Sequence, residues 1–372
     1  MSQSIDHPIE EQLLIDLVST PSLSGEETNA AQVFSRYASQ LGFSASIDQV
    51  GNTIADRGVT ECPARHIVLL GHIDTVPGDI PVRVEDGILY GRGSVDAKGP
   101  LAAMLVAASR IDIPDNVRLS VVAAVGEEAA ESIGANHIVK QWSPDACIIG
   151  EPSGWDGVTL GYKGRLLADV AVTSSNAHSA GPDGSAGDDL FAWWAQCLSQ
   201  IGEINAGIAS VINQIQSTIL NLETQNDGFE ETARMTIGFR LPTTHSPQDV
   251  QDLLNSCVIP GMKIGFSGSI NASMTDRNDA VVRSISAAIR SIGGRPMPKK
   301  KTGTADLNVV APIWGCPIAA YGPGDSSLDH TPNEHIHLDE LSKSVAVLEV
   351  AITNLIEELL AEEAPQVQCI RH

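Results

Sequence analysis

Short apolar runs alternating with segments of helical periodicity limit the possible folds of this chain more than any other feature. Three of the runs are His66–Leu70, Val117–Val125 and Ala146–Ile149, and helices are expected between them at about 98–110 and 132–141. Strands that are apolar on both faces have to be covered on both faces. The pattern therefore predicts an α/β fold with a mainly parallel central sheet flanked by helices.

Helical segments are expected near both ends of the chain. Ser24–Glu27 has the spacing of a capping box, in which the serine hydroxyl satisfies a helix N–H group and the glutamate side chain reaches back. An apolar stripe of helical period follows, and Gly42 is expected to end that helix. A strand at Ile318–Tyr321 and a long closing helix at about 338–362 complete the α/β pattern.

The segment 165–268 has a different pattern. Its expected elements follow the order βαββαβ, which is typical of a ferredoxin-like α+β sandwich. They are strands at Leu166–Thr173, Ser217–Glu223, Ala233–Phe239 and Met262–Phe266, and helices at about 187–204 and 247–256. The sequence therefore predicts a catalytic domain in two parts, 1–164 and 269–372, with a smaller domain inserted at 165–268.

The composition argues against several classes of protein. The chain has 372 residues, of which 42% are hydrophobic, so it can bury a sizeable core. Its net charge of −23 argues against nucleic acid or an anionic membrane as the main partner. No apolar run is long enough to span a membrane, the first residues lack a signal-peptide pattern, and the six cysteines form no CxxC pair. We therefore expect a cytoplasmic protein without a disulfide framework or a thiolate metal site.

Candidate metal ligands begin directly after the first apolar strand. His72 and Asp74 are two residues apart, so in an extended segment their side chains point the same way. An imidazole beside a carboxylate is typical of metal sites, although so short a pattern also arises without function. A second candidate is Asp96 in the glycine-rich segment Gly91–Gly99. The alternative is that Asp96 caps the helix that follows it.

Three more acids and a histidine occupy comparable places. Glu127 and Glu128 follow one apolar strand, and Glu151 follows the next. Adjacent carboxylates repel each other unless a cation or a proton intervenes, and because neighbours point in different directions, one can bind a metal while the other handles protons. His330 lies in a loop rich in Gly, Pro and Asp. The alternatives are a surface turn for the adjacent glutamates and an exposed loop position for His330.

Most of these candidates share one position in the expected fold. Five of them lie at or near carboxyl ends of strands, where open α/β sheets form their sites: His72, Asp96, Glu127, Glu128 and Glu151. Two histidines and three carboxylates suit two borderline divalent ions with one bridging carboxylate. Such ions can activate a water and polarise a carbonyl, while the remaining carboxylate passes the water's proton to a leaving amine. Because the sequence has no GxSxG or HExxH motif, we expect metal-dependent amide hydrolysis.

In these motifs the chain resembles the co-catalytic dizinc aminoacylase and carboxypeptidase family, which includes acetylornithine deacetylase and succinyl-diaminopimelate desuccinylase. The resemblance extends over nearly the whole chain and implies two divalent ions, Zn²⁺ or Co²⁺. The implied ligands are His72 and Glu151 for one ion, Glu128 and His330 for the other, and Asp96 as the bridge. The resemblance also implies that Asp74 orients His72 and that Glu127 is the general base and acid.

The inserted segment resembles the lid and dimerisation domain of that family. Asn176–Ala180 matches a segment whose histidine reaches the active site of the other subunit, which implies a homodimer in which His178 stabilises the oxyanion. Arg240 matches an arginine that contacts the substrate carboxylate, and Thr304 and Gly322 match loops that contact substrate. The alternatives are an exposed loop histidine and a plain surface arginine.

Two segments, Gly150–Arg165 and Tyr321–His330, most resemble one subgroup, the lysine-biosynthesis hydrolases of the α-aminoadipate route. Those enzymes release lysine, and in some organisms ornithine, from the glutamyl end of a small acidic amino-group carrier protein, and they have also been described as N-acetyl-lysine deacetylases. An acidic chain needs a local basic patch to bind such a carrier, with candidates Lys163, Arg165, Arg240 and Lys299–Lys301. The alternative for the three-lysine run is solvated surface. Alternative functions are acetylornithine deacetylase or dipeptidase activity, and a non-catalytic binding protein.

Overall fold

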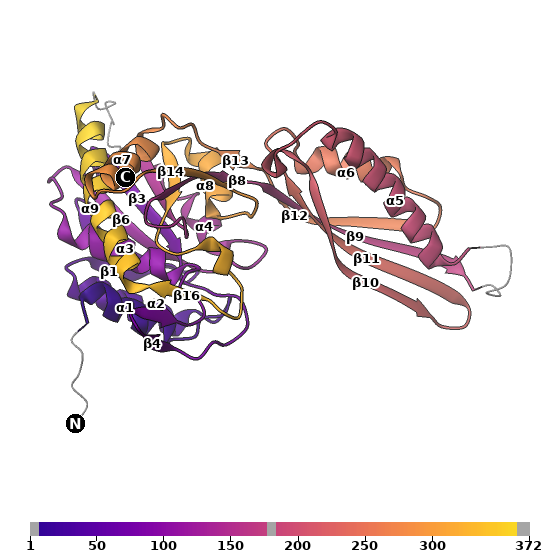
Figure 1. Ribbon diagram of the computed structural model, residues 1–372, viewed down its shortest axis with the longest axis horizontal. Helices are drawn as coiled ribbons and strands as arrows, with labels where there is room; N and C mark the ends of the chain where they lie inside the picture. Colours follow the sequence, from indigo (N-terminus) through magenta and orange to yellow (C-terminus); the bar gives the residue numbers. More distant parts are fainter. Residues whose placement is uncertain (1–6, 177–183, 363–372) are drawn as a thin grey trace. The chain divides into compact units, whose positions relative to one another are not determined.

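The computed structural model describes residues 7–176 and 184–362, which form two compact units (Figure 1). Unit 2 comprises Tyr162–Met274 and Lys300–Asn308, and unit 1 comprises the other described residues. Unit 2 is therefore inserted in the chain of unit 1. Compactness does not show what a unit does, so the catalytic and lid assignments, with their boundaries at 1–164, 165–268 and 269–372, stay predictions.

Unit 1 is built on a mixed sheet with a parallel centre. Its strands in spatial order are β1 (Ser44–Ile47), β2 (Thr53–Gly58), β6 (Val117–Ala124), β3 (Arg65–His72), β7 (Ala146–Gly150), β15 (Ile318–Tyr321) and β8 (Gly157–Tyr162). The neighbours β6, β3, β7 and β15 are parallel, whereas β1, β2 and β8 join antiparallel at the two sides. Every residue of β3 is buried, as expected for a strand that is covered on both faces. The α/β prediction is confirmed.

Helices flank this sheet (Figure 1). They are α1 (Ile9–Val18), α2 (Thr28–Gln40), α3 (Lys98–Arg110), α4 (Ile133–Ile138), α7 (Ala280–Ser291), α8 (Asp306–Trp314) and α9 (Leu338–Ala361). The closing helix α9 packs against α3 and α7. The remaining short elements are β4 (Arg83–Glu85), β5 (Ile88–Tyr90), β13 (Ser273–Met274), β14 (Met297–Lys301), β16 (His335–His337) and the 3₁₀ helix η2 (Ser326–Leu328).

Two glycines allow α3 to lie very close to the sheet. A Cβ atom on Gly71 would be 3.3 Å from Leu101 of α3, and a Cβ atom on Gly150 would be 3.0 Å from Met104 of the same helix. Gly71 and Gly150 end or nearly end β3 and β7, and each directly precedes a candidate ligand. The close packing of α3 therefore brings Asp96, two residues before this helix, to the ends of both strands.

Two expectations about helix starts differ from the structure. Among the described residues no side chain caps α2: its N-cap is Glu27, and the predicted capping box at Ser24–Glu27 is wrong. The Ser24 hydroxyl donates instead to Asp74, at 2.7 Å. Nor does Asp96 cap α3, whose N-cap is Ala97 without a side-chain hydrogen bond from the described residues. Gly42, with φ +88°, follows the end of α2 as predicted.

Unit 2 has the predicted order βαββαβ. Its elements are β9 (Gly164–Ser175), α5 (Ala186–Asn205), β10 (Gln216–Asn226), β11 (Glu230–Leu241), α6 (Pro247–Ser256) and β12 (Met262–Ile270), with the 3₁₀ helix η1 (Val211–Asn213) before β10. The sheet order is β10-β11-β9-β12, and every neighbouring pair is antiparallel. Buried and accessible residues alternate along β9 and β11, so one face of the sheet holds a core shared with Trp193 and Leu254 of the two helices.

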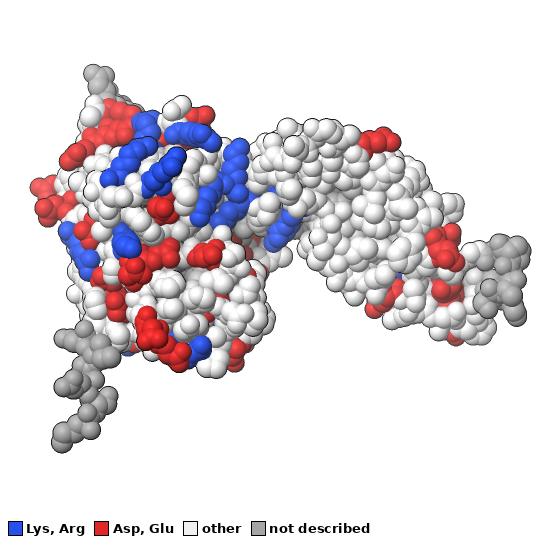
Figure 2. Space-filling view, viewed as in Figure 1, with Lys and Arg blue, Asp and Glu red and all other residues white. Residues whose placement is uncertain are grey.

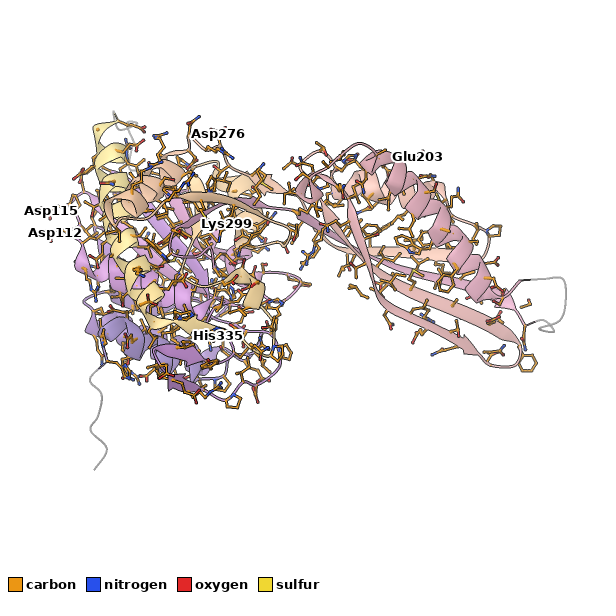
Figure 3. The ribbon with its side chains drawn as sticks, viewed as in Figure 1. Asp112, Asp115, Glu203, Asp276, Lys299 and His335 are labelled. Carbon is orange, nitrogen blue, oxygen red and sulfur yellow. The ribbon has the colours of Figure 1, made fainter. Side chains whose placement is uncertain are left out.

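Charge is unevenly spread over unit 1. The segment Thr275–Lys299, which includes α7, carries five Arg or Lys residues and two Asp residues in a chain of net charge −23. Figure 2 shows Lys and Arg side chains gathered over α7 and β14. Figure 3 labels Lys299 on β14 and Asp276 shortly before α7.

In the described part of the chain no helix is long and apolar enough to cross a membrane. Cys62 takes part in a disulfide bond, which the cysteine spacing did not predict.

Candidate metal centre

Asp74 contacts several residues of the centre. It is fully buried just beyond β3, and its Oδ1 lies 3.5 Å from His72 Nδ1. Its two oxygens also accept hydrogen bonds from the backbone N–H groups of Glu127, at 3.1 Å, and Glu128, at 3.0 Å. The Ser24 hydroxyl adds a further hydrogen bond. His72 Nδ1 also lies 3.1 Å from the Asp74 carbonyl oxygen, so Asp74 holds the ring with both its backbone and its side chain. Its carboxylate also holds the segment that carries both glutamates.

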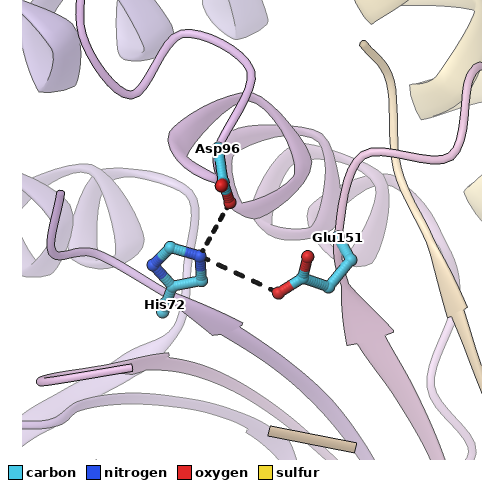
Figure 4. A group of neighbouring side chains, drawn as sticks. All are labelled: His72, Asp96 and Glu151. Carbon is cyan, nitrogen blue, oxygen red and sulfur yellow. Dashed lines mark hydrogen bonds and ion pairs between the residues drawn. The ribbon is translucent and has the colours of Figure 1, made fainter. Parts of the chain in front are cut away.

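Asp96 lies between the two histidines. Its Oδ1 is 3.2 Å from His72 Nε2, and its Oδ2 is 3.1 Å from His330 Nε2. Glu151 Oε1 lies 3.8 Å from His72 Nε2, and Figure 4 shows Asp96 and Glu151 both turned toward that ring. Because each oxygen of Asp96 faces a different imidazole, this carboxylate has the arrangement of a bridging ligand.

The second histidine completes a group on the other side of Asp96. His330 Nε2 is 2.9 Å from Glu128 Oε1, and the His330 side chain is 52% exposed. His330 has φ +61°, in the left-handed region that non-glycine residues rarely adopt. His330 is exposed on a loop, as the alternative interpretation of the sequence held, but the loop turns its ring toward the carboxylates of Asp96 and Glu128.

These contacts define two half-sites that share Asp96. The strand half-site consists of His72 and Glu151, which come from the ends of β3 and β7, and the loop half-site consists of Glu128 and His330, which come from loops. In each half-site, together with Asp96, the potential ligand atoms lie within 4.8 Å of one another. Both sets are histidine and carboxylate donors of the kind that bind Zn²⁺, Co²⁺ or Mn²⁺.

The electrostatics of the centre favour a cation. Burial by itself lowers the pKa of His72, but hydrogen bonds to Asp74 and Asp96 and the charge of Glu127 outweigh it, so the pKa lies well above 6.5. Hydrogen bonds that the His330 ring donates to Asp96 and Glu128 raise the pKa of His330 to about 10. Burial and the charge of Asp96 raise the pKa of Glu128. In the metal-free protein, protons on these side chains therefore balance the negative charge of the carboxylates. Divalent ions can replace the protons at the same residues.

Glu127 lies beside the ligands of both half-sites. Its carboxylate, His72 and Glu128 offer ligand atoms within 4.8 Å of one another. Its backbone is held by the hydrogen bond to Asp74. This position allows Glu127 to exchange a proton with a group bound between the half-sites.

Sequence reasoning missed two buried charges next to the centre. Glu334, fully buried, accepts hydrogen bonds from the backbone of Val95 and Asp96. Lys98 is also buried, and its ammonium donates to the carbonyls of Leu17 and Thr20. The only available signal was position, since Glu334 follows His330 by four residues and Lys98 follows Asp96 by two.

The other predicted site residues are more scattered. His178 lies outside the described residues. In unit 2, Arg240 Nη1 donates to Thr304 Oγ1 at 3.2 Å. In unit 1, Gly322 packs so tightly that a Cβ atom there would be 2.5 Å from Pro100 and 2.9 Å from the Glu151 carbonyl oxygen. Gly322 therefore lies directly beside the strand half-site.

Lys163 does not belong to a surface patch. It is buried, and its ammonium donates to the carbonyls of Val211 and Gln214 and to the Gln216 side chain. Burial, followed by the charge of Arg240, lowers the pKa of Lys163 to about 8. The sequence expectation for this residue is wrong because backbone carbonyls of unit 2 surround it.

Solved structures with this fold include metallopeptidases. An M20 family metallo-carboxypeptidase, Sso-CP2, from Sulfolobus solfataricus superposes with a TM-score of 0.77 at 18% identity, over 94% of this chain and 100% of that one. The Bacillus subtilis YXEP protein, described as a dinuclear metal-binding peptidase from the M20 family, gives a TM-score of 0.66 at 13% identity, over 96% of this chain and 98% of that one. At these identities the similarity concerns the fold alone.

Sequence relatives are much closer. The [LysW]-lysine hydrolase of Deinococcus radiodurans is 41% identical over 96% of this chain and 99% of that protein. The [LysW]-lysine/[LysW]-ornithine hydrolase of Saccharolobus islandicus is 30% identical over 92% of this chain and 95% of that protein. The profile of one family matches residues 68–354, which include every ligand of both half-sites. The chain therefore belongs to peptidase family M20/M25/M40.

Proposed function

We propose that this protein is a dimetal amidohydrolase that releases lysine, and ornithine as a second substrate, from the glutamyl end of an amino-group carrier protein. The observation that carries the dimetal chemistry is Asp96, whose two oxygens each face one histidine. The carrier-linked substrate is supported by the names of relatives such as the [LysW]-lysine hydrolase of Deinococcus radiodurans. Such a reaction belongs to lysine and arginine biosynthesis.

In this proposal His72 and Glu151 would hold one ion, Glu128 and His330 would hold the other, and Asp96 would be shared by both. Two bound divalent ions supply a Lewis acid for the scissile carbonyl and a water of lowered pKa. Asp74 keeps Nδ1 of His72 occupied, which leaves Nε2 as the ligand atom. Glu127 accepts the water's proton and returns it to the leaving amine of lysine, so the residue starts and ends the reaction ionised.

We further propose that unit 2 contributes substrate contacts and a homodimer interface. Arg240, paired with Thr304, offers a guanidinium to the substrate carboxylate, and His178 stabilises the oxyanion of the other subunit's reaction. The support for a dimer is apolar exposure at the sheet edge strand β10, where Leu220 is 59% exposed, and on α5, where Phe191 is 52% exposed. An exposed apolar edge strand is a common site of strand pairing.

A basic surface of unit 1 supports binding of an acidic carrier. The α7–β14 patch consists of Arg277, Arg283, Arg290, Arg295 and Lys299. Arg283 pairs with Glu358, whereas Arg277, Arg290 and Arg295 are exposed and form no ion pair with a described carboxylate. Lys299 Nζ donates to the carbonyl of Ser153, at 2.6 Å, two residues after Glu151. A carrier on this patch would therefore lie next to the loop that follows the strand half-site.

A substrate panel tests the proposal. The Zn²⁺- or Co²⁺-loaded protein is incubated with carrier-linked lysine, carrier-linked ornithine, N-acetyl-lysine, N-acetylornithine and simple dipeptides, and kcat/KM is compared. We expect carrier-linked lysine to exceed both acetylated amino acids by at least about tenfold, which corresponds to about 1.4 kcal/mol. The excess should shrink as salt rises, because exposed charges are screened.

Each alternative predicts another outcome. A preference for N-acetylornithine would identify an acetylornithine deacetylase, and a preference for dipeptides would identify a dipeptidase. If the metal-loaded protein hydrolyses none of the substrates but still binds the carrier, it is a binding protein. Arg290→Glu should lower kcat/KM for carrier-linked lysine and leave that for N-acetyl-lysine unchanged, which separates docking from chemistry.

A further inference from the structure

Glu334 is a charged residue at the centre that none of the proposed chemistry uses. It is fully buried in the loop between η2 and β16. Its Oε1 accepts hydrogen bonds from the backbone N–H groups of Val95, at 3.0 Å, and Asp96, at 3.1 Å. Its Oε2 accepts from the Arg92 guanidinium at 2.8 Å. A buried carboxylate requires such partners, and these attach it to the backbone of the bridging residue.

Arg92 extends this connection to the loop of His330. Besides Glu334, Arg92 Nη1 donates to the carbonyl of Thr331, at 3.2 Å, and Nε donates to the carbonyl of Gly78, at 3.0 Å. Thr331 directly follows His330. The Arg92–Glu334 ion pair therefore ties the backbone of Asp96 to the backbone next to His330.

His330 needs this support more than the other proposed ligands do. Its side chain is 52% exposed, so little packing holds it, and its left-handed backbone is unfavourable for a non-glycine residue. His72, in contrast, lies on β3, where hydrogen bonds to β6 and β7 fix the backbone. Glu151 directly follows β7 and lies beside the tightly packed Gly322.

We propose that Glu334, held by Arg92, is a positioning residue that sets the distance between Asp96 and His330 and thereby determines the affinity of the loop half-site for its ion. The strand half-site shares Asp96 but depends less on this pair, because His72 and Glu151 are held at the ends of β3 and β7. The inference rests on the proposed dimetal function, but it concerns ion binding rather than turnover. Outer partners of metal ligands commonly change affinity by about 10–100-fold, which is the size of effect expected here.

The test uses Glu334→Gln in the full-length protein, because the amide keeps the shape of the side chain and removes the charge that Arg92 binds. Glu10→Gln is the matched control: Glu10 is also a buried glutamate of unit 1, and its Oε2 lies 2.6 Å from Arg110 Nη2. The metal-free proteins are titrated with Co²⁺ and followed by calorimetry and by the visible spectrum of bound Co²⁺. Thermal unfolding of each variant checks that it is folded.

The wild-type protein should bind two ions, and Glu334→Gln should weaken the second by about 10–100-fold and the first clearly less. Glu10→Gln should bind both ions like the wild type, even if it loses similar stability. Arg92→Lys keeps the charge but not the fork of donors, so it should reproduce part of the loss and provides a second variant if Glu334→Gln fails to fold. In the double variant, the loss of binding free energy for the second ion should be smaller than the sum of the two separate losses.

Three results would overturn the inference: equal weakening of both ions in Glu334→Gln, unchanged binding of both, or the same change in Glu10→Gln. These results leave the proposed function intact if the wild type hydrolyses carrier-linked lysine. Conversely, a wild type that binds two ions but cleaves no substrate overturns the proposed function and not the role of Glu334. If the wild type binds a single ion, both fail.

Discussion

The two half-sites share a carboxylate and have similar donors, but they are held in opposite ways. In the strand half-site His72 is 1% and Glu151 9% exposed, and both follow glycines at the carboxyl ends of buried parallel strands. In the loop half-site Glu128 is also only 9% exposed, but His330 is 52% exposed and depends on a neighbouring ion pair for its backbone position. The sheet builds one half directly, whereas buried side chains have to build the other. We therefore expect ions in the two half-sites to differ in affinity and in exchange rate.

Removal of divalent ions should have the largest effect and test this comparison first. Dialysis against a chelator should abolish hydrolysis, because Glu127 alone provides only a base. Ion content measured over time should fall in two phases, with the exposed loop half-site losing its ion before the buried strand half-site. Zn²⁺ or Co²⁺ should restore activity. Loss of both ions in a single phase would remove the difference between the half-sites, and amidase activity that survives chelation would contradict a metal mechanism.

Glu127→Gln should have the next largest effect, because Glu127 belongs to neither half-site and serves both. Replacing a general base typically lowers kcat by about 10²–10⁴-fold, and we expect that loss without a change in the number of bound ions. Glu131→Gln, in the same segment and exposed, should retain kcat and serves as the control. Stopped assays and metal analysis of the same samples decide. A nearly normal kcat would exclude Glu127 as the base.

The sequence could predict the strand half-site better than the other parts of the centre. His72 and Glu151 could be placed because apolar runs identify buried strands and parallel strands end at one edge of the sheet. Asp96 was placed near them only as a candidate, since its alternative as a helix cap was equally consistent with its position. In the structure the N-cap of α3 is Ala97, and Asp96 instead faces His72 and His330, which lie far from it in the sequence.

Features that depend on single tertiary contacts could not be predicted. Ser24 and Glu27 have a capping spacing, yet Ser24 donates to Asp74, fifty residues away. Lys163 has the composition of a surface cation, yet three oxygens of unit 2 surround its ammonium. Glu334 has no periodicity or motif that distinguishes it from other loop acids. In each case the local sequence shows only which contacts the side chain favours. The contact that forms depends on a residue that the fold brings close from elsewhere in the chain.

Asp74→Asn tests the residue that connects the two half-sites. Asp74 holds His72 through one contact and the backbone of Glu127 and Glu128 through two others. Burial raises the pKa of Asp74, but the hydrogen bonds that it accepts from His72 and Ser24 outweigh this effect. The pKa is therefore lowered overall, and the carboxylate is ionised. We expect Asp74→Asn to weaken both ions by about 10–100-fold in Co²⁺ titrations, unlike Glu334→Gln. Weakening of only one ion would show that Asp74 serves a single half-site.

The smallest expected effect concerns the stability of the metal-free protein. Hydrogen bonds that the His330 ring donates to Asp96 and Glu128 raise its pKa from 6.5 to about 10, so the protonated ring stabilises the fold fully below pH 6.5. That contribution is lost as the pH rises through about 10. It should stay below about 1 kcal/mol, because half-exposed ion pairs are screened by water.

His330→Asn is the variant that isolates this contribution, because asparagine tolerates the left-handed backbone at this position. In the presence of a chelator, the unfolding temperature of the wild type should fall relative to that of His330→Asn between pH 6.5 and 10. If the unfolding temperature of the wild type instead rises relative to that of His330→Asn with increasing pH, the two carboxylates do not hold the proton of His330. The contrast between the two half-sites would then rest on exposure alone.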